Sequence, residues 1–381
     1  MYSNFFIETL PHQGPSQGFE KRSPSPDKTG CSDNSNDHNK LSIIYSNLDT
    51  FMNKKAEITN LIEKENPDVL CFTETLDKRN PELTEAEAKI NGYETFLGKN
   101  PQRGTVIYVK ETLNPKRSLE HETNDYTEHV WCSIKYNDEN ILIGNIYRSP
   151  NSSDNNNEKL LNLLKNKTNE KFDKIFITGD FNLPNINWQT GLSSNIYEIS
   201  FIESFNDAYL FQHIEKPTRY RQGQKSNILD LVFTRENSDI IDIEYLSPIG
   251  KSDHLTLKLI TNIDKIAMED DTPPRFDFKR CNITDFRRLI KETDWAVLHK
   301  LNVEECWNLI YSKLDEGMEK FVPKVDIKSR KKSPPWMNPF VKKSIKKKHK
   351  LFKKLFNSNN SYVYKLYMNA RNESARIVKN A

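Results

Sequence analysis

Four short segments of this chain each place a carboxylate at or just beyond the end of an apolar, strand-like run. They are Thr73-Glu74-Thr75, Gly179-Asp180-Phe181-Asn182, Leu229-Asp230-Leu231 and Ser252-Asp253-His254. Because the ends of neighbouring strands can meet at one edge of a core, we expect these side chains to converge. Carboxylates gathered around a histidine repel one another unless a hard divalent cation lies among them, and oxygen ligands suit Mg²⁺.

Such a group of side chains is suited to metal-assisted hydrolysis of a phosphoester. A water molecule must lose a proton to a carboxylate, and the phosphate must share its charge with a cation, a histidine and amide donors. The leaving oxygen must also be stabilised. The four segments contain a candidate for each of these roles.

Short apolar or alternating runs predict strands, and helical spacing predicts helices between them. The predicted strands are Leu41–Tyr45, Val69–Phe72, Thr105–Val109, Val130–Lys135, Ile141–Ile146, Lys174–Ile177, Ile228–Phe233 and Leu255–Leu259. The predicted helices are Lys55–Glu65, which ends before Asn66-Pro67, and Glu158–Lys167. This mixture favours an α/β fold with two packed sheets and helices outside them.

Composition divides the chain into further parts. Residues 1–40 are predicted to be a disordered leader, because residues 11–40 are polar and proline-containing with almost nothing to bury. Residues 41–262 carry the predicted strands, and the polar, proline-containing stretch at residues 263–275 predicts a linker. Helical spacing predicts a helical segment at residues 276–325.

The charge of the chain is concentrated at its C-terminal end. Residues 328–381 contain 16 Lys or Arg against Glu373 alone, so the remaining residues carry a net charge of −12 although the whole chain is at +3. Residues 326–381 predict a basic helical hairpin that turns at Asn357–Ser361. The candidates for contact with nucleic-acid phosphates are Lys342, Lys343, Lys346 and Lys347. The alternative is a solvated helical face.

The five cysteines are an odd number, are widely separated and form no C-x-x-C pair, which argues against a disulfide framework and a zinc site. No signal-peptide pattern and no run of eighteen apolar residues is present. We therefore expect a soluble protein of the nucleus, the cytoplasm or both, not secreted and without a membrane partner. The lysine-rich segments at 328–332 and 342–350 are candidate nuclear-import signals.

Several candidate site residues have a structural alternative. Strand-end residues such as Asn47 and Asp49 are commonly turn formers. A strand-end tyrosine such as Tyr147 commonly packs with its hydroxyl in solvent. Thr218 and Arg219, in Lys-Pro-Thr-Arg-Tyr, are candidates for contact with a neighbouring phosphate, with a loop cap as the alternative.

Two of the four segments favour a functional role by their internal pattern. Asp230 lies in an apolar strand, where a buried charge needs a partner, and His254 is the expected one. An Asp–His pair fixes the orientation of the imidazole and raises its pKa. In the other segment, we expect Gly179 to let the chain turn sharply, so that Asp180 and Asn182 point the same way.

In chain order, these motifs resemble the endonuclease/exonuclease/phosphatase superfamily, and within it the apurinic-endonuclease-like domains of LINE-type, non-LTR retrotransposons. The motifs that carry the resemblance are Pro-Asp-Val-Leu-Cys-Phe-Thr-Glu-Thr, Asn-Ile-Tyr-Arg-Ser-Pro, Lys-Pro-Thr-Arg-Tyr and Leu-Asp-Leu-Val-Phe-Thr. Pro334-Pro335-Trp336-Met337 and the following lysines look like the connector that precedes the reverse transcriptase in these elements. One departure is the single glycine in Arg103-Gly104-Thr105, where the family has a glycine-rich run.

The resemblance implies a four-layer α/β sandwich of two packed, mainly antiparallel sheets flanked by helices, followed by a helical C-terminal extension. It implies an Mg²⁺ site, with Mn²⁺ as the alternative metal. The implied metal ligands are Glu74, Asp49 and Asp253, braced by Asn47. The implied catalytic residues are Asp180 and Asn182, which activate and position water, Asp230, which orients His254, and His254 with Tyr147, which steady the phosphate.

Members of this family cleave DNA and leave a 3′-hydroxyl that primes reverse transcription of the element's RNA, so DNA and that RNA are the expected partners. Two alternatives remain open. One is a repair-type abasic-site nuclease or phosphatase of the same fold, and the other is a catalytically idle nucleic-acid-binding remnant. No Tyr-x-Asp-Asp or Phe-x-Asp-Asp polymerase motif is present, so a truncated element, a fragment and a standalone protein all remain open. Target sequence and oligomeric state are not predicted.

Overall fold

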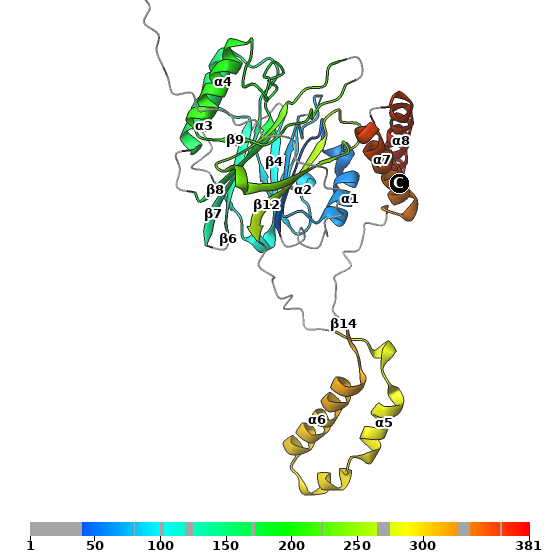
Figure 1. Cartoon of the computed structure of the whole chain (residues 1–381). Helices are drawn as coiled ribbons and strands as arrows, with labels where there is room; N and C mark the ends of the chain where they lie inside the picture. The colour runs from blue at the N-terminus through cyan, green and yellow to red at the C-terminus, as the bar shows by residue number, and fades with distance from the viewer. Residues whose placement is uncertain are drawn as a thin grey trace, which may run out of the picture. The chain divides into compact units, whose positions relative to one another are not determined.

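The computed structural model describes residues 40–381 apart from 80, 100–102, 119–124, 137, 169–171, 222–223, 265–274, 326–335 and 359. The predicted leader lies outside the described residues except for Lys40, and so does most of the predicted linker at 263–275. The described residues contain two six-stranded sheets and a small two-stranded one (Figure 1).

The first six-stranded sheet is built around a parallel pair of strands. Its order is β11 (Ile240–Leu246), β12 (Thr256–Asp264), β1 (Lys40–Asn47), β2 (Val69–Thr73), β4 (Thr105–Lys110) and β3 (Tyr93–Leu97). Strands β1 and β2 are parallel and are joined by helix α1 (Lys55–Glu65), whereas the other neighbours are antiparallel. A left-handed residue, Asn66 with φ 45°, ends α1 before Pro67.

The second sheet repeats this arrangement. Its order is β5 (Lys116–Arg117), β6 (His129–Tyr136), β7 (Glu139–Tyr147), β8 (Lys174–Asp180), β10 (Asp230–Thr234) and β9 (Phe211–Gln212). Strands β7 and β8 are parallel and are joined by helix α3 (Asp154–Thr168). Each sheet therefore has one parallel pair with antiparallel strands on both sides of it.

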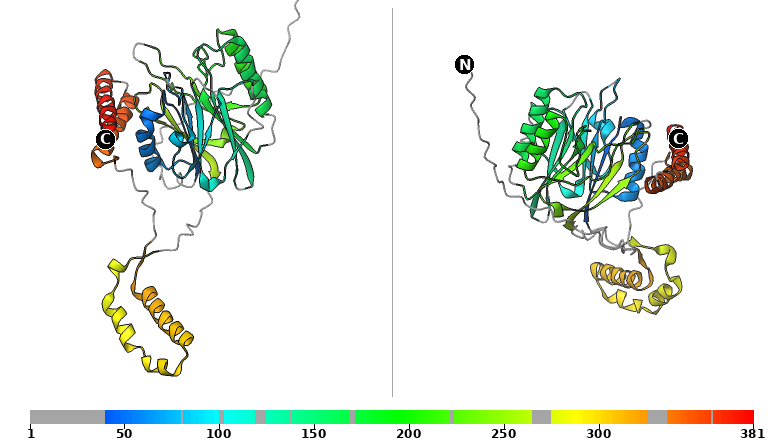
Figure 2. Two further views of the ribbon diagram at one scale, coloured as in Figure 1. Left: turned by 180° about the vertical axis from the view of Figure 1, so that it is seen from behind. Right: turned by 45° about the horizontal axis from the view of Figure 1, so that its top comes forward.

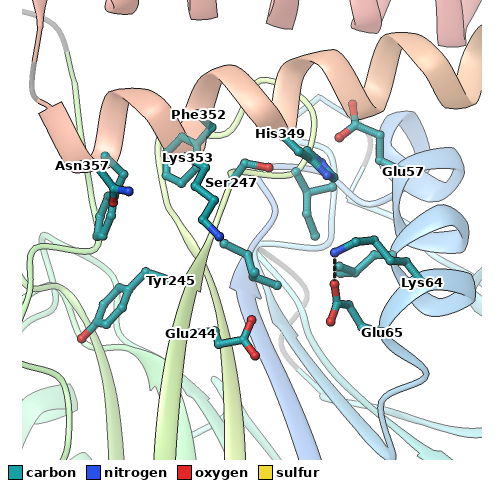
Figure 3. Close-up of a pocket in the computed structure, with 14 residues that line it drawn as sticks. Glu57, Lys64, Glu65, Glu244, Tyr245, Ser247, His349, Phe352, Lys353 and Asn357 are labelled. Atoms are coloured by element: carbon teal, nitrogen blue, oxygen red, sulfur yellow. Dashed lines mark hydrogen bonds and ion pairs between the residues drawn. The ribbon is translucent and has the colours of Figure 1, made fainter. Parts of the chain in front are cut away.

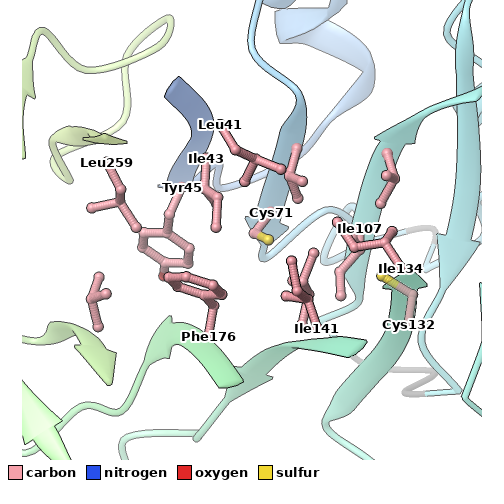
Figure 4. Close-up of a cluster of buried hydrophobic side chains, with 14 of the residues drawn as sticks. Leu41, Ile43, Tyr45, Cys71, Ile107, Cys132, Ile134, Ile141, Phe176 and Leu259 are labelled. Carbon is pink, nitrogen blue, oxygen red and sulfur yellow. The ribbon is translucent and has the colours of Figure 1, made fainter. Parts of the chain in front are cut away.

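The two sheets pack face to face and carry helices on their outer faces (Figure 2). The core between them, drawn in Figure 4, includes Ile43 and Cys71 of the first sheet and Cys132 and Phe176 of the second. Helix α1 packs on the outer face of the first sheet. Helices α3 and α4 (Ile196–Asp207) pack on the outer face of the second. The predicted four-layer sandwich with mainly antiparallel sheets is confirmed.

Each predicted strand and helix of this region overlaps an observed one, but the edge strands β3, β5, β9 and β11 and the helices α2 (Glu85–Ala88) and α4 were not predicted. An edge strand has one unpaired side and is partly exposed, so its pattern is mixed. In β11, Ile241 and Asp242 are both exposed although Ile240 packs on the core. Such strands lack the continuous apolar run that identified β7 and β8.

The described C-terminal residues form two pairs of helices. Helices α5 (Ile283–Glu292) and α6 (Val303–Phe321) pack through Phe286 and Phe321, next to the short strands β13 (Arg275–Phe276) and β14 (Lys324–Val325). Helices α7 (Pro339–Ser358) and α8 (Ser361–Lys379) form the predicted hairpin, and Asn360 caps the start of α8. The predicted helical C-terminal extension is thus confirmed. No helix among the described residues is long and apolar enough to cross a membrane.

Candidate active site

The topology brings the polar strand ends to one edge of the sandwich. The C-terminal ends of parallel strands share an edge, and antiparallel neighbours begin at that edge. Asn47 therefore lies opposite Thr73 at the ends of β1 and β2. Tyr147 lies opposite Asp180 at the ends of β7 and β8, and Asp180 also lies opposite Asp230, the first residue of β10. The predicted convergence of strand ends is present in the structure.

Four side chains form what we call the buried group, namely Asn47, Asp180, Asp230 and His254. Nδ1 of His254 lies 2.8 Å from Oδ2 of Asp230, and its Nε2 lies 4.0 Å from Oδ2 of Asp180. The Nδ2 amide of Asn47 donates to the same Asp180 oxygen at 2.8 Å. All four side chains are buried, with at most 5% of any residue exposed. The Asp230–His254 pair predicted from the sequence is therefore present in the geometry.

Asp230 is held by further hydrogen bonds that sequence reasoning missed. The Tyr45 hydroxyl donates to its Oδ1 at 2.9 Å and lies 3.0 Å from the Thr73 hydroxyl. The Asp230 backbone N–H donates to the Thr218 hydroxyl at 3.1 Å. A buried tyrosine usually needs a partner for its hydroxyl, so a tyrosine in the apolar run of β1 was the available signal.

The position of Thr218 argues against a direct phosphate contact. Its side chain is completely buried, and its hydroxyl accepts the N–H groups of both Leu229 and Asp230. The loop-cap alternative describes this residue better, because a buried hydroxyl that braces a loop is not available to a ligand.

The charges of the buried group are strongly coupled. Burial, with Asp230 beside it, raises the pKa of Asp180 to about 7, although His254 opposes this. Burial alone would lower the pKa of His254, but Asp230, with help from Asp180 and Asp253, raises it to about 9. At neutral pH the imidazole is therefore a cation and Asp180 is close to its midpoint, which is the range in which general acids and bases are effective.

The turn after β8 differs from the prediction. Gly179 lies in extended strand, and a Cβ there would come within 2.1 Å of the Ile146 carbonyl oxygen, so glycine is required for close approach and not for a turn. The turn is made by Asn182, whose φ is 49°. The Asn182 backbone N–H donates to Oδ1 of Asp180 at 3.2 Å, and its side-chain amide donates to the Arg148 carbonyl at 2.8 Å.

A second cluster, which we call the rim group, consists of Asp49, Glu74 and Arg103. The Arg103 guanidinium contacts Glu74 closely and lies 3.6 Å from Oδ1 of Asp49. Both acids have left-handed backbones, with φ of 47° for Asp49 and 51° for Glu74. This conformation costs conformational energy in a non-glycine residue and is found most often at functional sites. Arg103 was not predicted as a site residue. Its signal was its position just before β4, the antiparallel neighbour of β2, which begins at this edge.

Two more predicted residues lie at the edge of the site. Asp253 accepts a bond from Nε of Arg219 at 3.0 Å and lies 3.9 Å from Nε2 of His254. Burial and Asp180 raise the pKa of Tyr147, so its hydroxyl stays protonated at neutral pH and is available as a donor. The structure thus brings together every predicted catalytic and metal-binding residue at one edge.

The rim group fits a divalent cation better than the buried group does. Asp180, Asp230 and His254 each offer a ligand atom within 4.8 Å of the others. Both oxygens of Asp230 and Nδ1 of His254 are, however, already engaged within the protein. At the rim, Arg103 contacts both carboxylates and Lys78 lies 3.6 Å from Asp49, but the Asp49 side chain is 54% exposed, so a cation from solvent can reach the carboxylates there. The oxygen donors there suit Mg²⁺.

A cleft of about 740 Å³ opens over these residues. Its walls include residues of both groups, Tyr147, Arg219 and, from helix α8, Tyr364, Met368 and Arg371. The four predicted lysines of α7 are not among the described residues that line it. Lys342 instead lies 3.0 Å from Glu63 and Lys347 lies 3.1 Å from Glu373, while Lys343 and Lys346 are exposed.

Comparison with known proteins finds similarity to nucleases. Residues 141–258 match the sequence profile of a family described as endonuclease-reverse transcriptase, and no curated protein matches the chain. The endonuclease domain of TRAS1, a telomere-specific non-LTR retrotransposon, is similar at 16% identity and a TM-score of 0.49, over 59% of this chain and 100% of that one. An AP endonuclease from Archaeoglobus fulgidus is similar at 16% identity and a TM-score of 0.45, over 58% and 100%. The AP endonuclease LMAP from Leishmania major is similar at 17% identity and a TM-score of 0.46, over 59% and 88%.

The profile match has a clear place in the fold. It runs from β7 into β12 and contains Tyr147, Asp180, Asp230 and His254, which are the residues that the topology gathers at the site. The resemblance predicted from the motifs is confirmed by this match. Residues 141–258 therefore match the endonuclease-reverse transcriptase profile, within a domain of two packed six-stranded sheets.

Proposed function

We propose that the two-sheet domain is a divalent-cation-dependent endonuclease that hydrolyses one DNA phosphodiester bond and leaves a 3′-hydroxyl. One observation carries the proposal. A histidine oriented by a buried aspartate faces a second aspartate whose pKa is about 7, beside two carboxylates at the rim of an open cleft. A site that only bound nucleic acid would not need a buried and coupled acid–base cluster.

The residues of the buried group, with Asn182 and Tyr147 beside them, take distinct roles in the proposed reaction. Asp180 accepts a proton from the attacking water, and Asn182 positions that water or the phosphate. Asp230 holds the protonated His254, which donates a hydrogen bond to a phosphoryl oxygen. The Tyr147 hydroxyl donates a second hydrogen bond to the negatively charged phosphate. Positioned acid–base help of this kind typically contributes about 10²- to 10⁴-fold in rate.

Glu74 and Asp49 are the proposed ligands of Mg²⁺, or alternatively Mn²⁺, with Asp253 close by. Asn47 braces Asp180 by the bond described above and receives the Asp49 backbone N–H on its Oδ1 at 3.1 Å. When bound, the cation would neutralise charge on the phosphate and lower the pKa of coordinated water. Arg103 holds the two carboxylates together when the cation is absent.

The test is nicking of supercoiled plasmid by the whole chain in Mg²⁺, with EDTA as the metal-free control. We expect EDTA to abolish nicking, and Glu74→Gln and His254→Ala each to slow it by about 10²-fold or more. Asp242→Asn, which neutralises an exposed acid on β11, is the matched control and should nick like the wild type. A folded, DNA-binding wild type that leaves plasmid intact in both Mg²⁺ and Mn²⁺ would refute the proposal.

The chemistry of the nick tests the second half of the proposal. A DNA polymerase should incorporate labelled nucleotide at the nick directly, because a 3′-hydroxyl is a primer end. If incorporation requires prior treatment with a 3′-phosphatase, the predicted cleavage polarity is wrong. A strong preference for an oligonucleotide with an abasic site over intact plasmid would instead favour the repair-type alternative.

A further inference from the structure

Helix α7 is held on the two-sheet domain by a buried ion pair. Lys348 is completely buried, contacts Glu57 of α1 closely and donates to the Pro248 carbonyl at 3.0 Å. The other contact of Glu57 is the Gly250 backbone N–H, at 2.9 Å. A buried lysine without partners is strongly unfavourable, so this set of contacts is specific to one docking position of the helix.

Aromatic packing supports the same docking position. Phe352 of α7 and Tyr367 of α8 pack on Leu255, the residue after His254. Phe356 stacks on Tyr245 of β11, with ring centroids 5.9 Å apart. Figure 3 shows α7 crossing over side chains of α1 and β11. The residues drawn there line a cavity of about 380 Å³. The hairpin is therefore joined to the chain segment that carries the catalytic histidine.

This docking turns one face of α8 into a wall of the active-site cleft. Tyr364, Met368 and Arg371 line the cleft, and their spacing of four and three residues places them on one helical face. A second cavity of about 460 Å³ shares these three residues with the cleft, together with Tyr220, Arg221 and Asp253. The two cavities thus have a common wall of aromatic and cationic side chains, whose one acid, Asp253, is paired with Arg219.

Two polar atoms on or beside this wall have no hydrogen-bond partner among the described residues. Nε of Arg371 and the hydroxyl of the adjacent Tyr367 are buried, and neither has a hydrogen-bond partner in the described part of the chain. Buried donors without partners are unfavourable, and a phosphate is the group that a guanidinium binds best. Glu373, the single acid of α8, is paired with Lys347 and does not line either cavity.

We propose that this face of α8 is part of the DNA-binding surface of the nuclease. Arg371 contacts a backbone phosphate near the scissile bond, and Tyr364 packs against the neighbouring sugar or base. This inference rests on the proposed function for the choice of DNA as ligand. It places the nucleic-acid contacts of the basic hairpin on α8, in contrast to the α7 lysines that the charge pattern indicated.

The test is the affinity of the whole chain for a fluorescent DNA duplex, measured by anisotropy in EDTA over a range of salt concentrations. We expect Arg371→Gln to raise Kd about 10-fold and to reduce the slope of log K against log salt by about 0.9. We expect Tyr364→Ala to raise Kd by about 5- to 10-fold. Arg376→Gln is the matched control, because it removes the same charge from an exposed position on another face of α8, and it should change Kd less than about 2-fold.

Nicking separates this inference from the proposed function. The control variant Arg376→Gln, whose side chain lines neither cavity, should nick at the wild-type rate. Wild-type affinity in both Arg371→Gln and Tyr364→Ala would overturn the inference, even if Glu74→Gln abolishes nicking and so supports the function. An inactive wild type whose DNA affinity still depends on Arg371 would refute the function and support the inference. A duplex RNA that competes better than DNA of the same sequence would overturn the choice of DNA.

Discussion

The buried group and the rim group lie at the same edge of the sandwich, and each combines carboxylates with a cation, yet they are held in different ways. The acids of the buried group are at most 1% exposed and receive hydrogen bonds from Tyr45, Asn47 and His254. In the rim group, the Asp49 side chain is 54% exposed, and Arg103 is the cation that bridges both acids. The buried group is thus organised by the fold, whereas the rim group is organised by charge balance and should respond to added cations.

The largest expected effect is on stability. Asp230→Ala leaves the Tyr45 hydroxyl and the His254 ring without their shared acceptor in a buried site, so we expect the free energy of unfolding to fall by about 3 kcal/mol. Glu74→Ala should lower it by less than about 1 kcal/mol, because Arg103 retains Asp49. Urea denaturation in EDTA measures both values. Equal losses in the two variants would remove the distinction between the groups.

The next effect is stabilisation by metal. At a Mg²⁺ concentration 100 times its Kd, wild-type protein should gain about 2.7 kcal/mol of stability. We expect Glu74→Gln to lose this gain and Asp230→Asn to keep it, as measured by the shift of Tm on adding MgCl₂. The reverse result would place the cation among Asp180, Asp230 and His254.

The smallest effect is the dependence of stability on pH that the buried group contributes. The pKa of His254 rises from 6.5 to about 9, so its contribution is complete below pH 6.5 and is lost as the pH rises through 9. The pKa of Asp180 rises from 3.8 to about 7, so its protonated form also loses its contribution as the pH rises through 7.

Both shifts act in the same direction. In EDTA, the free energy of unfolding should therefore fall between pH 7 and 8, by about 1 kcal/mol. Above pH 8 the buried Lys54, whose pKa is lowered to about 8, acts in the opposite direction. Glu74→Gln should show the same decline, because the rim group is not its source. Stability that is constant or rises over this range in the wild type would contradict the proposed charge state of His254.

The candidate site was predictable where its residues belong to local patterns. Glu74 and Asp180 lie at the ends of apolar strands, and Asp230 begins one. Parallel strands end at the same edge of a sheet and antiparallel neighbours begin there, so this convergence could be predicted. Tyr45 and Arg103 escaped prediction because the signal of each, a tyrosine in an apolar run and a position just before β4, does not name the distant residue that it contacts. The hydroxyl of Tyr45 reaches an acid 185 residues away, in the other sheet.

Sequence by itself indicated the central strands of both sheets and the helices α1 and α3, since hydrophobic spacing and terminators such as Asn66-Pro67 act over a few residues. It also indicated the resemblance that the profile match over residues 141–258 confirms, because the motifs that carry the resemblance are short and contiguous. Only the tertiary structure decided which face of the basic hairpin meets the cleft. That choice depends on contacts such as the one between Lys348 and Glu57, which are 291 residues apart. It also depends on burial, because a buried charged side chain must pair within the protein, whereas an exposed one can bind a ligand.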